Sequence, residues 1–417
     1  MKKSVLLFCL MLTACGLAAV SISNAHAAGF ALYEWSSRGN GMGGALTALV
    51  DDASAIAYNP SAMTRVEGTQ SMAGVTLIQP HADVEMNGET ASTKGKVYVP
   101  PHAYITHQVN DDLWVGFGAY TRYGVGTNYD HDWEGRYNVY KASLESHSFS
   151  PAVAYKVNDK WSVGAAVDAM WLSFDLRKII SPLSPVPAAR NADLHLDNTG
   201  WAWGGNISTH YQFTDKLSVG AIYRTPQRLV GSGKTKILET GVEEDLTMRA
   251  TLPGSLTFGL AFEPTDVWRF EVDAIYTNWS DYKQIEYRYG SQTATQAFFG
   301  QSQTDAAKHF KNVWRLQVGT EIDINDANTL RLGFVWDQSP IKTGYEDYML
   351  PTNDRTMYSV GYGYKSGDWN VDLSLMYLNM DDRHIDARGN SLVTGIYDTD
   401  ITGSSAYLGG VSVTYNF

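Results

Sequence analysis

Apolar and polar residues alternate with a period of two from about residue 70 to the end of the chain. Successive side chains of a β-strand point to opposite faces, so this alternation predicts strands with one apolar and one polar face. The last segment places Tyr407, Gly409, Val411, Val413, Tyr415 and Phe417 on one face and Leu408, Gly410, Ser412, Thr414 and Asn416 on the other. The segments that begin at Trp268, Trp314 and Trp369 alternate in the same way.

Two kinds of connection alternate between these segments. Short turn signals recur at 110–112, 158–160, 214–216, 264–266, 325–327 and 366–368, and Trp or Leu follows most of them. Longer polar segments lie near 86–97, 127–141, 179–198, 236–244, 290–308, 338–353 and 386–403. Tight turns that alternate with long loops are typical of an outer-membrane β-barrel with periplasmic turns and extracellular loops. The aromatic residues after the turns would form the girdle at the membrane interface.

This pattern predicts fourteen strands, and the even number places both ends of the barrel in the periplasm. The expected strands are 70–86, 98–109, 112–127, 142–157, 161–178, 199–213, 217–236, 244–263, 267–290, 308–324, 328–338, 353–366, 369–386 and 404–417. Many exceed the roughly 9–11 residues that cross a bilayer, so their ends should project beyond it.

Residues 28–69 precede the first strand and differ from it. They contain Gly39, Gly41, Gly43 and Gly44, followed by helix-compatible small residues from Ala45 to Ala57. The lumen of such a barrel is too wide for side chains alone to fill. The predicted fold is therefore all-β, a 14-stranded antiparallel transmembrane β-barrel over 70–417 with a partly helical plug, 28–69, in its lumen.

Residues 1–27 form a predicted signal peptide. Lys2 and Lys3 precede a mostly apolar run from Val5 to Val20, and Ala25-His26-Ala27 is a cleavage site. Leu12-Thr13-Ala14-Cys15 resembles a lipobox, which would instead place a lipid on Cys15. We favour cleavage after Ala27 because the apolar run continues beyond Cys15. Both cysteines, Cys9 and Cys15, then leave with the peptide, and no disulfide is possible in the mature chain.

Composition supports a barrel. The 417 residues include 25 Tyr, 12 Trp and 38 Gly with 18% charged residues, and past the N-terminus no run of 18 apolar residues offers a helical span. The formal net charge of −12 argues against a nucleic-acid partner. Terminal Phe417 on an alternating strand resembles the signal read by the barrel-assembly machinery. We expect the barrel to contact outer-membrane lipid and lipopolysaccharide.

Several short motifs resemble the FadL/TodX family of outer-membrane transporters for hydrophobic compounds. In order along the chain they are Ala28-Gly29-Phe30-Ala31-Leu32-Tyr33-Glu34, Asp51-Asp52-Ala53, Tyr58-Asn59-Pro60-Ser61, Trp133-Glu134-Gly135-Arg136-Tyr137, Ser150-Pro151-Ala152-Val153-Ala154-Tyr155-Lys156, Leu252-Pro253, Thr277-Asn278-Trp279-Ser280-Asp281-Tyr282, Ser339-Pro340 and Leu350-Pro351 with Asp354-Arg355. Ser61 stands where the family's Asn-Pro-Ala element has Ala. The matches run in order over essentially the whole mature chain.

The resemblance implies a mechanism. A hydrophobic ligand is captured among the outer loops and moves into a pocket inside the barrel. The N-terminal residues, here Ala28, Gly29 and Phe30, shift, and the ligand leaves sideways through a kink in the third strand. Such a molecule gains about 0.8 kcal/mol for each CH₂ that it buries in apolar surroundings.

The third strand contains Gly116, Gly118, Gly124 and Gly126. Glycine weakens strand pairing and often marks a bend. With the family resemblance we favour a lateral opening over the alternative, in which these glycines give room for the plug or a neighbouring side chain. In the plug, Asn59-Pro60 sets a defined bend, and we favour contact with the kinked strand over an ordinary turn.

Lumen-facing arginines are candidate partners for a ligand carboxylate. Arg315, Arg269 and Arg331 occupy polar-face positions. For each of them we favour the alternative, a pair with a lumen acid such as Glu271, Asp273 or Glu321.

We expect no catalytic residues, metal site or cofactor. His131-Asp132 and His147-Ser148 are weak candidates for hydrolase chemistry, and no metal-binding or phosphate-binding motif is present. The favoured function is passive uptake of long-chain fatty acids. One alternative is uptake of aromatic hydrocarbons such as toluene. The other is general diffusion of hydrophilic solutes, which the predicted plug argues against.

Overall fold

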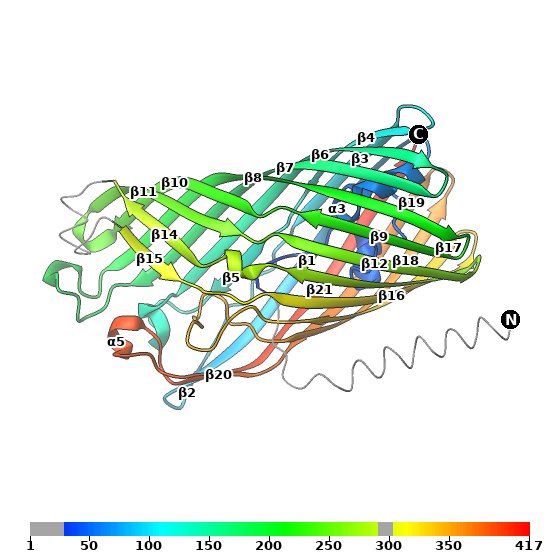
Figure 1. The fold of residues 1–417 in the computed structure, drawn as a ribbon. Coiled ribbons are helices and arrows are strands. Elements are labelled where there is room, and N and C mark those ends of the chain that lie inside the picture. The colour runs from blue at the N-terminus through cyan, green and yellow to red at the C-terminus, as the bar shows by residue number, and fades with distance from the viewer. Residues whose placement is uncertain (1–28, 291–302) are drawn as a thin grey trace.

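The protein is an antiparallel β-barrel that closes on itself. The computed structural model describes residues 29–290 and 303–417, so Ala28 and the predicted signal peptide lie outside the described residues. Strand β1 (Thr69–Met86) pairs on one side with β21 (Thr399–Asn416) and on the other with β3 (Pro101–Gln108) (Figure 1). The described residues form fourteen barrel strands, which confirms the predicted fold class.

Seven of these barrel strands run without interruption and seven consist of two segments each. The uninterrupted strands are β1, β6 (Lys141–Asn158), β7 (Trp161–Ile179), β8 (Asp193–Thr214), β17 (Asn328–Asp337), β18 (Arg355–Ser366) and β21. The interrupted ones are β2 (Glu89–Ser92) with β3, β4 (Leu113–Tyr120) with β5 (Gly124–Asn128), β9 (Leu217–Arg224) with β10 (Gln227–Ile237), β11 (Val242–Leu252) with β12 (Ser255–Thr265), β13 (Trp268–Thr277) with β14 (Gln284–Tyr289), β15 (Gln303–Ala307) with β16 (Val313–Asn325), and β19 (Trp369–Met380) with β20 (Arg383–Ile385).

The predicted strand bounds need correction at these breaks. Proline lacks an N–H for the ladder, and Pro226 and Pro253 stand where β9 gives way to β10 and β11 to β12. The second strand was expected from residue 98 but β3 begins at Pro101. Strands β8 and β21 begin several residues before the predicted 199 and 404, because polar residues continue the pairing beyond the membrane.

Short turns and long loops lie at opposite ends of the barrel, as predicted. The strands on either side of residues 159–160, 215–216, 266–267, 326–327 and 367–368 are joined by tight turns at the end that carries the C-terminus (Figure 1). At the other end the loops carry η2 (Glu134–Tyr137), η3 (Pro187–Ala189), η4 (Leu238–Thr240) and α5 (Ser391–Thr394). Among the described residues, no helix is both long enough and apolar enough to cross a membrane.

The segment before β1 fills the lumen near the turn end. It contains α2 (Ser37–Gly41), α3 (Ala55–Tyr58) and η1 (Pro60–Arg65), and nearly all of its residues from Trp35 to Met63 are buried (Figure 1). We call residues 29–68 the plug. Close approach needs glycine on both sides, since a Cβ on Gly361 of β18 would lie 2.8 Å from the Cα of Gly41.

Buried carboxylates of the barrel wall hold the plug. Glu271 accepts hydrogen bonds from the backbone N–H groups of Ala48 at 2.6 Å and Leu49 at 2.8 Å, and Asp273 accepts one from the Thr47 hydroxyl at 2.7 Å. A buried backbone N–H group that finds no hydrogen-bond partner destabilises the fold, so these acceptors matter. They satisfy the backbone of an irregular segment that has no regular ladder of its own.

Candidate functional site

Three adjoining cavities run through the barrel from the loop end to its side wall. The outer cavity, about 990 Å³, lies among the loops and is lined by residues such as Leu194, Tyr287 and Lys178. The central cavity shares Ile285, Lys308, Asp347 and Met349 with it. The side cavity, about 1320 Å³, shares Phe30, Val125, Leu144 and Leu350 with the central one. Because neighbouring cavities share walls, small side-chain movements would join them.

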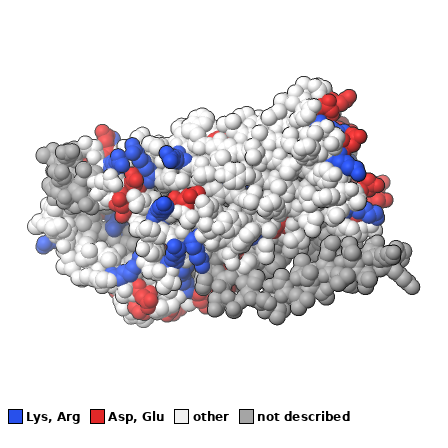
Figure 2. Space-filling view, viewed as in Figure 1, with Lys and Arg blue, Asp and Glu red and all other residues white. Residues whose placement is uncertain are grey.

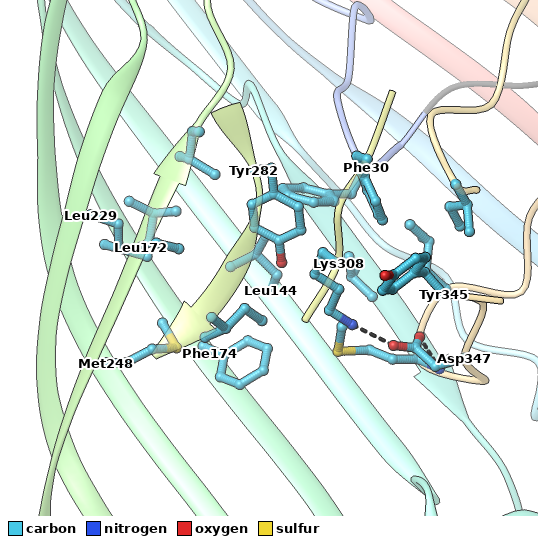
Figure 3. Close-up of a pocket in the computed structure, with 18 residues that line it drawn as sticks. Phe30, Leu144, Leu172, Phe174, Leu229, Met248, Tyr282, Lys308, Tyr345 and Asp347 are labelled. Atoms are coloured by element: carbon cyan, nitrogen blue, oxygen red, sulfur yellow. Dashed lines mark hydrogen bonds and ion pairs between the residues drawn. The ribbon is translucent and has the colours of Figure 1, made fainter. Parts of the chain in front are cut away.

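The central cavity is almost entirely apolar. Leu172, Phe174 and Met248 project into it from β7 and β11 (Figure 3). Tyr282 and Phe310 also line it. Its charged lining residues are Lys308 and Asp347, which form an ion pair with each other (Figure 3). A pocket of this kind suits an apolar molecule whose polar end lies near Lys308.

Phe30 separates the central cavity from the side cavity. Its ring packs edge-on against Trp279 at 5.0 Å and Tyr282 at 5.2 Å between centroids, and it lies 5.6 Å from the ring of Tyr123. Gly29 must precede it, because a Cβ there would lie 2.6 Å from the Trp279 ring. The start of the plug therefore lies at the boundary between the two cavities.

The third barrel strand is broken beside Phe30. Residues 121–123 lie between β4 and β5, and the plug takes over their pairing. Leu32 N–H donates to the Arg122 carbonyl at 2.8 Å, and Gly124 N–H donates to the Phe30 carbonyl at 3.0 Å. The Arg122 side chain turns inward to a buried ion pair with Asp168 at 2.7 Å. The kink thus exists, and the plug satisfies its backbone.

The barrel wall is incomplete next to this break. In the residues that the structure describes, β5 forms its ladder with β6 alone, and β3 pairs with β4 but not with β5. The preceding strand is interrupted over residues 93–100, with a single backbone hydrogen bond from Lys94 to Asn128 across the gap. The side cavity lies behind this gap, lined by Tyr98, Pro100 and Gly126 among others.

Asp354 ends the loop whose residues Leu350 and Thr352 line the side cavity. Burial, and then the nearby charge of Asp381, raise the pKa of the Asp354 carboxyl to about 8. The carboxyl is therefore largely protonated at neutral pH, which keeps this loop less acidic than its sequence indicates.

Comparison with known proteins identifies the family of this chain. Residues 18–417 match the model of the outer membrane protein transport protein family (OMPP1/FadL/TodX). The chain belongs to this family.

Among its relatives is the long-chain fatty acid transport protein of Salmonella typhi, 24% identical over 96% of both chains. Outer membrane protein P1 of Haemophilus influenzae is also 24% identical, over 95% of this chain and 97% of the other. A FadL homologue of Pseudomonas aeruginosa has the same fold, with a TM-score of 0.82 at 18% identity over 94% of this chain and 100% of that one. The toluene transporter TodX of Pseudomonas putida gives 0.72 at 20% identity over 93% and 99%. The protein is thus an outer-membrane transporter of the FadL/TodX type.

The four glycines of the third strand divide into two pairs. A Cβ on Gly116 or Gly118 would lie 2.8 or 2.9 Å from Ile56 of the plug, so these two give room to the plug. Gly124 and Gly126 lie beyond the break and line the side cavity, where a Cβ on Gly126 would meet the Tyr98 ring. Of the four candidates for a lateral opening, only this second pair lies at the gap.

Asn59 and Pro60 contact the plug itself and strands β7 and β8. Asn59 donates to the carbonyls of Thr47 at 2.8 Å and of Thr209 in β8 at 3.3 Å, and Pro60 approaches Gly164 of β7. Contact between this bend and the kinked strand stays a prediction. The bend at Asn59-Pro60 thus joins the plug to β7 and β8 of the barrel wall.

The three candidate arginines all pair with acids of the lumen. Arg315 binds Asp337 at 2.7 Å, Arg269 binds Glu321 at 2.9 Å and Asp323 at 2.8 Å, and Arg331 binds Glu321 and, at 2.7 Å, Asp372. These are internal pairs of the type favoured from the sequence, and Arg269 and Arg331 share Glu321. Binding of a ligand carboxylate by any of them stays a prediction.

Sequence reasoning missed the cations that do line the cavities. Lys178 is the last residue but one of β7, and Lys308 follows β15 at the start of a predicted strand. It also missed an exposed group at the loop end, where β20 and β21 bring ligand atoms of His384, Asp386 and Asp398 within 4.8 Å of one another. A loop of eleven residues separates Asp386 from Asp398, and the sequence analysis found no metal-binding motif there.

Proposed function

We propose that the protein takes up long-chain fatty acids passively and releases them sideways through the gap beside the third strand. The observation that carries this proposal is the series of three cavities with shared walls, from the loops to that gap. Each step keeps an acyl chain in apolar surroundings, at about 0.8 kcal/mol for each CH₂ kept out of water.

The periplasmic end offers an unfavourable exit for such a ligand. The cavity there, about 2210 Å³, is lined by charged residues including Arg38, Asp51, Glu321 and Asp372. An acyl chain that left through it would lose its apolar contacts. The gap in the side wall leads instead toward lipid, which supports lateral release.

Two lysines favour a fatty acid over a neutral aromatic hydrocarbon. Lys178 lines the outer cavity and forms no ion pair within residues 29–290 and 303–417, while Lys308 stands between the outer and central cavities. A carboxylate gains a charge-assisted hydrogen bond from such a cation, whereas toluene gains nothing from it. Relatives of the chain carry both kinds of name, long-chain fatty acid transport proteins and toluene transporters.

Replacing Lys178 tests the substrate class. We expect Lys178→Met to weaken oleate binding about fivefold or more and to leave binding of oleyl alcohol, which lacks the charge, unchanged. The measurement is displacement of a fluorescent fatty acid from the purified protein in detergent, with Lys365→Met at the turn end as the control for lost charge. Tight binding of toluene with no displacement by oleate would contradict the fatty-acid proposal and favour aromatic hydrocarbons.

We also propose that the chain has no hydrolase activity. His131 lies 3.1 Å from Asp193 at the loop end, whereas His147 stacks on Trp171. These two histidines therefore do not share one candidate catalytic group. Incubation with phospholipid should release no fatty acid, and release that disappears in His131→Ala would overturn this.

A further inference from the structure

Two exposed arginines stand on the lipid side of the barrel wall near its loop end. Arg228 of β10 and Arg249 of β11 belong to the rows of side chains that alternate with the lumen-facing Leu229 and Met248. The strands pair Val230 with Arg249 and Arg228 with Thr251, so the two arginines are diagonal neighbours on one face. Lys and Arg, together with Asp and Glu, gather over the loop end of the wall, whereas the band between it and the turn end shows few charged residues (Figure 2).

The neighbouring charges have partners on the same surface, whereas these two do not. Lys234 pairs with Asp245 at 2.8 Å, and Arg288 pairs with Glu286 at 3.2 Å. Glu286 is the cross-strand neighbour of Arg249, but its carboxylate is bound to Arg288. Within the described part of the chain neither Arg228 nor Arg249 forms an ion pair or a side-chain hydrogen bond. Their guanidinium groups are available to an external anion.

The distance of the two arginines from the periplasmic turns indicates which part of the membrane they face. Arg228 is paired in register with Trp203 of β8, and Val230, beside Arg249, with Trp201. Trp203 precedes the last residue of β8 by 11 positions, which at the rise and tilt of barrel strands is roughly 25–30 Å above the periplasmic turns. The apolar band of such barrels is about 25 Å tall and ends in an aromatic girdle. Trp201 and Trp203, 45% and 63% exposed, mark that girdle.

We propose that Arg228 and Arg249 bind a phosphate group of lipid A, the phosphorylated glycolipid anchor of the outer leaflet. Its phosphates lie at the level of the outer girdle, and its acyl chains would pack on the apolar wall below. The planar guanidinium fork suits two-point contact with phosphate oxygens. The hydroxyls of Ser232, Thr247 and Thr251 flank the pair on the same face and offer further donors.

The test compares lipid A with its dephosphorylated form. Native mass spectrometry of the purified protein in detergent gives the apparent affinity for each, and we expect the phosphorylated form to bind at least fivefold tighter. In the Arg228→Gln/Arg249→Gln variant this preference should disappear. The variant Lys216→Gln/Lys365→Gln, which removes two charges from the turn end, should retain it. Unchanged heat-modifiable migration on gels shows that each variant is folded.

Three outcomes would overturn the proposal. The first is equal binding of both lipid forms by the wild-type protein. The second is an undiminished preference in the arginine variant. The third is binding of phosphatidylglycerol as tightly as lipid A with the same dependence on Arg228 and Arg249, which would make a general anionic phospholipid the partner.

Discussion

Replacing Glu321 by Gln should release the plug from the barrel wall. Glu321 is 2% exposed and binds three arginines at once: Arg38 of the plug at 3.0 Å, Arg269 at 2.9 Å, and Arg331. Removing one partner of a buried ion pair costs about 3–5 kcal/mol, because the remaining charges stay buried without compensation. We expect the free energy that holds the plug in the barrel to fall by an amount of this order.

Conductance provides the measurement. A displaced plug leaves a polar lumen, so the Glu321→Gln protein should show larger single-channel conductance in planar bilayers than the wild-type protein. Limited proteolysis of the folded barrel should cut residues 29–68 faster. A variant with wild-type conductance and protease resistance would show that the network does not anchor the plug.

Asp323→Asn is the matched control. Asp323 binds Arg269 at 2.8 Å near the periplasmic rim, but its side chain is about a quarter exposed and, among the described residues, forms no hydrogen bond or ion pair with the plug. A solvent-exposed pair contributes about 0–1 kcal/mol. This variant should therefore keep its plug. Arg38→Gln removes the plug's side of the contact and should act in the same direction as Glu321→Gln, with a smaller effect because Arg269 and Arg331 still satisfy Glu321.

The barrel could be predicted from the sequence because its determinants are local. Alternation fixes which face of a strand is apolar, and turn residues fix where the chain reverses, so strands such as 161–178 agree with β7 to within one residue. The break at residues 121–123 has no such local cause. It persists because Leu32 and Phe30, far away in sequence, supply the hydrogen bonds that the wall lacks there.

The candidate site was predictable only in part, for a related reason. A missing Cβ serves equally well where a plug packs and where a wall opens, so sequence alone could not separate Gly116 and Gly118 from Gly124 and Gly126. Likewise, Arg315 and Lys308 are both cations on lumen strands. Whether a cation lines a cavity depends on the positions of partners such as Asp337 and Asp347, which come from other strands and loops.

A disulfide between the plug and the broken strand should stop uptake reversibly. Ala31 and Tyr123 form an isolated antiparallel bridge, flanked by the hydrogen bonds of Leu32 and Gly124. Residues opposite each other at such a non-hydrogen-bonded position have Cα atoms about 4.5 Å apart, which a disulfide can span. The chain has two native cysteines, Cys9 and Cys15, both within the predicted signal peptide, so the new pair would have no competitors in the mature protein.

In the oxidised Ala31→Cys/Tyr123→Cys protein, Phe30 is tethered between the central and side cavities. We expect oleate binding to persist and uptake into cells to fall about tenfold or more, because ligand can reach the central cavity but the segment that separates it from the gap cannot move. Reduction should restore uptake to the level of the two single-cysteine variants. Equal uptake in the oxidised and reduced forms would mean that the ligand does not pass Phe30. The periplasmic cavity, with its lining of charged side chains, would then be the exit despite the cost of bringing an acyl chain past Arg38 and Glu321.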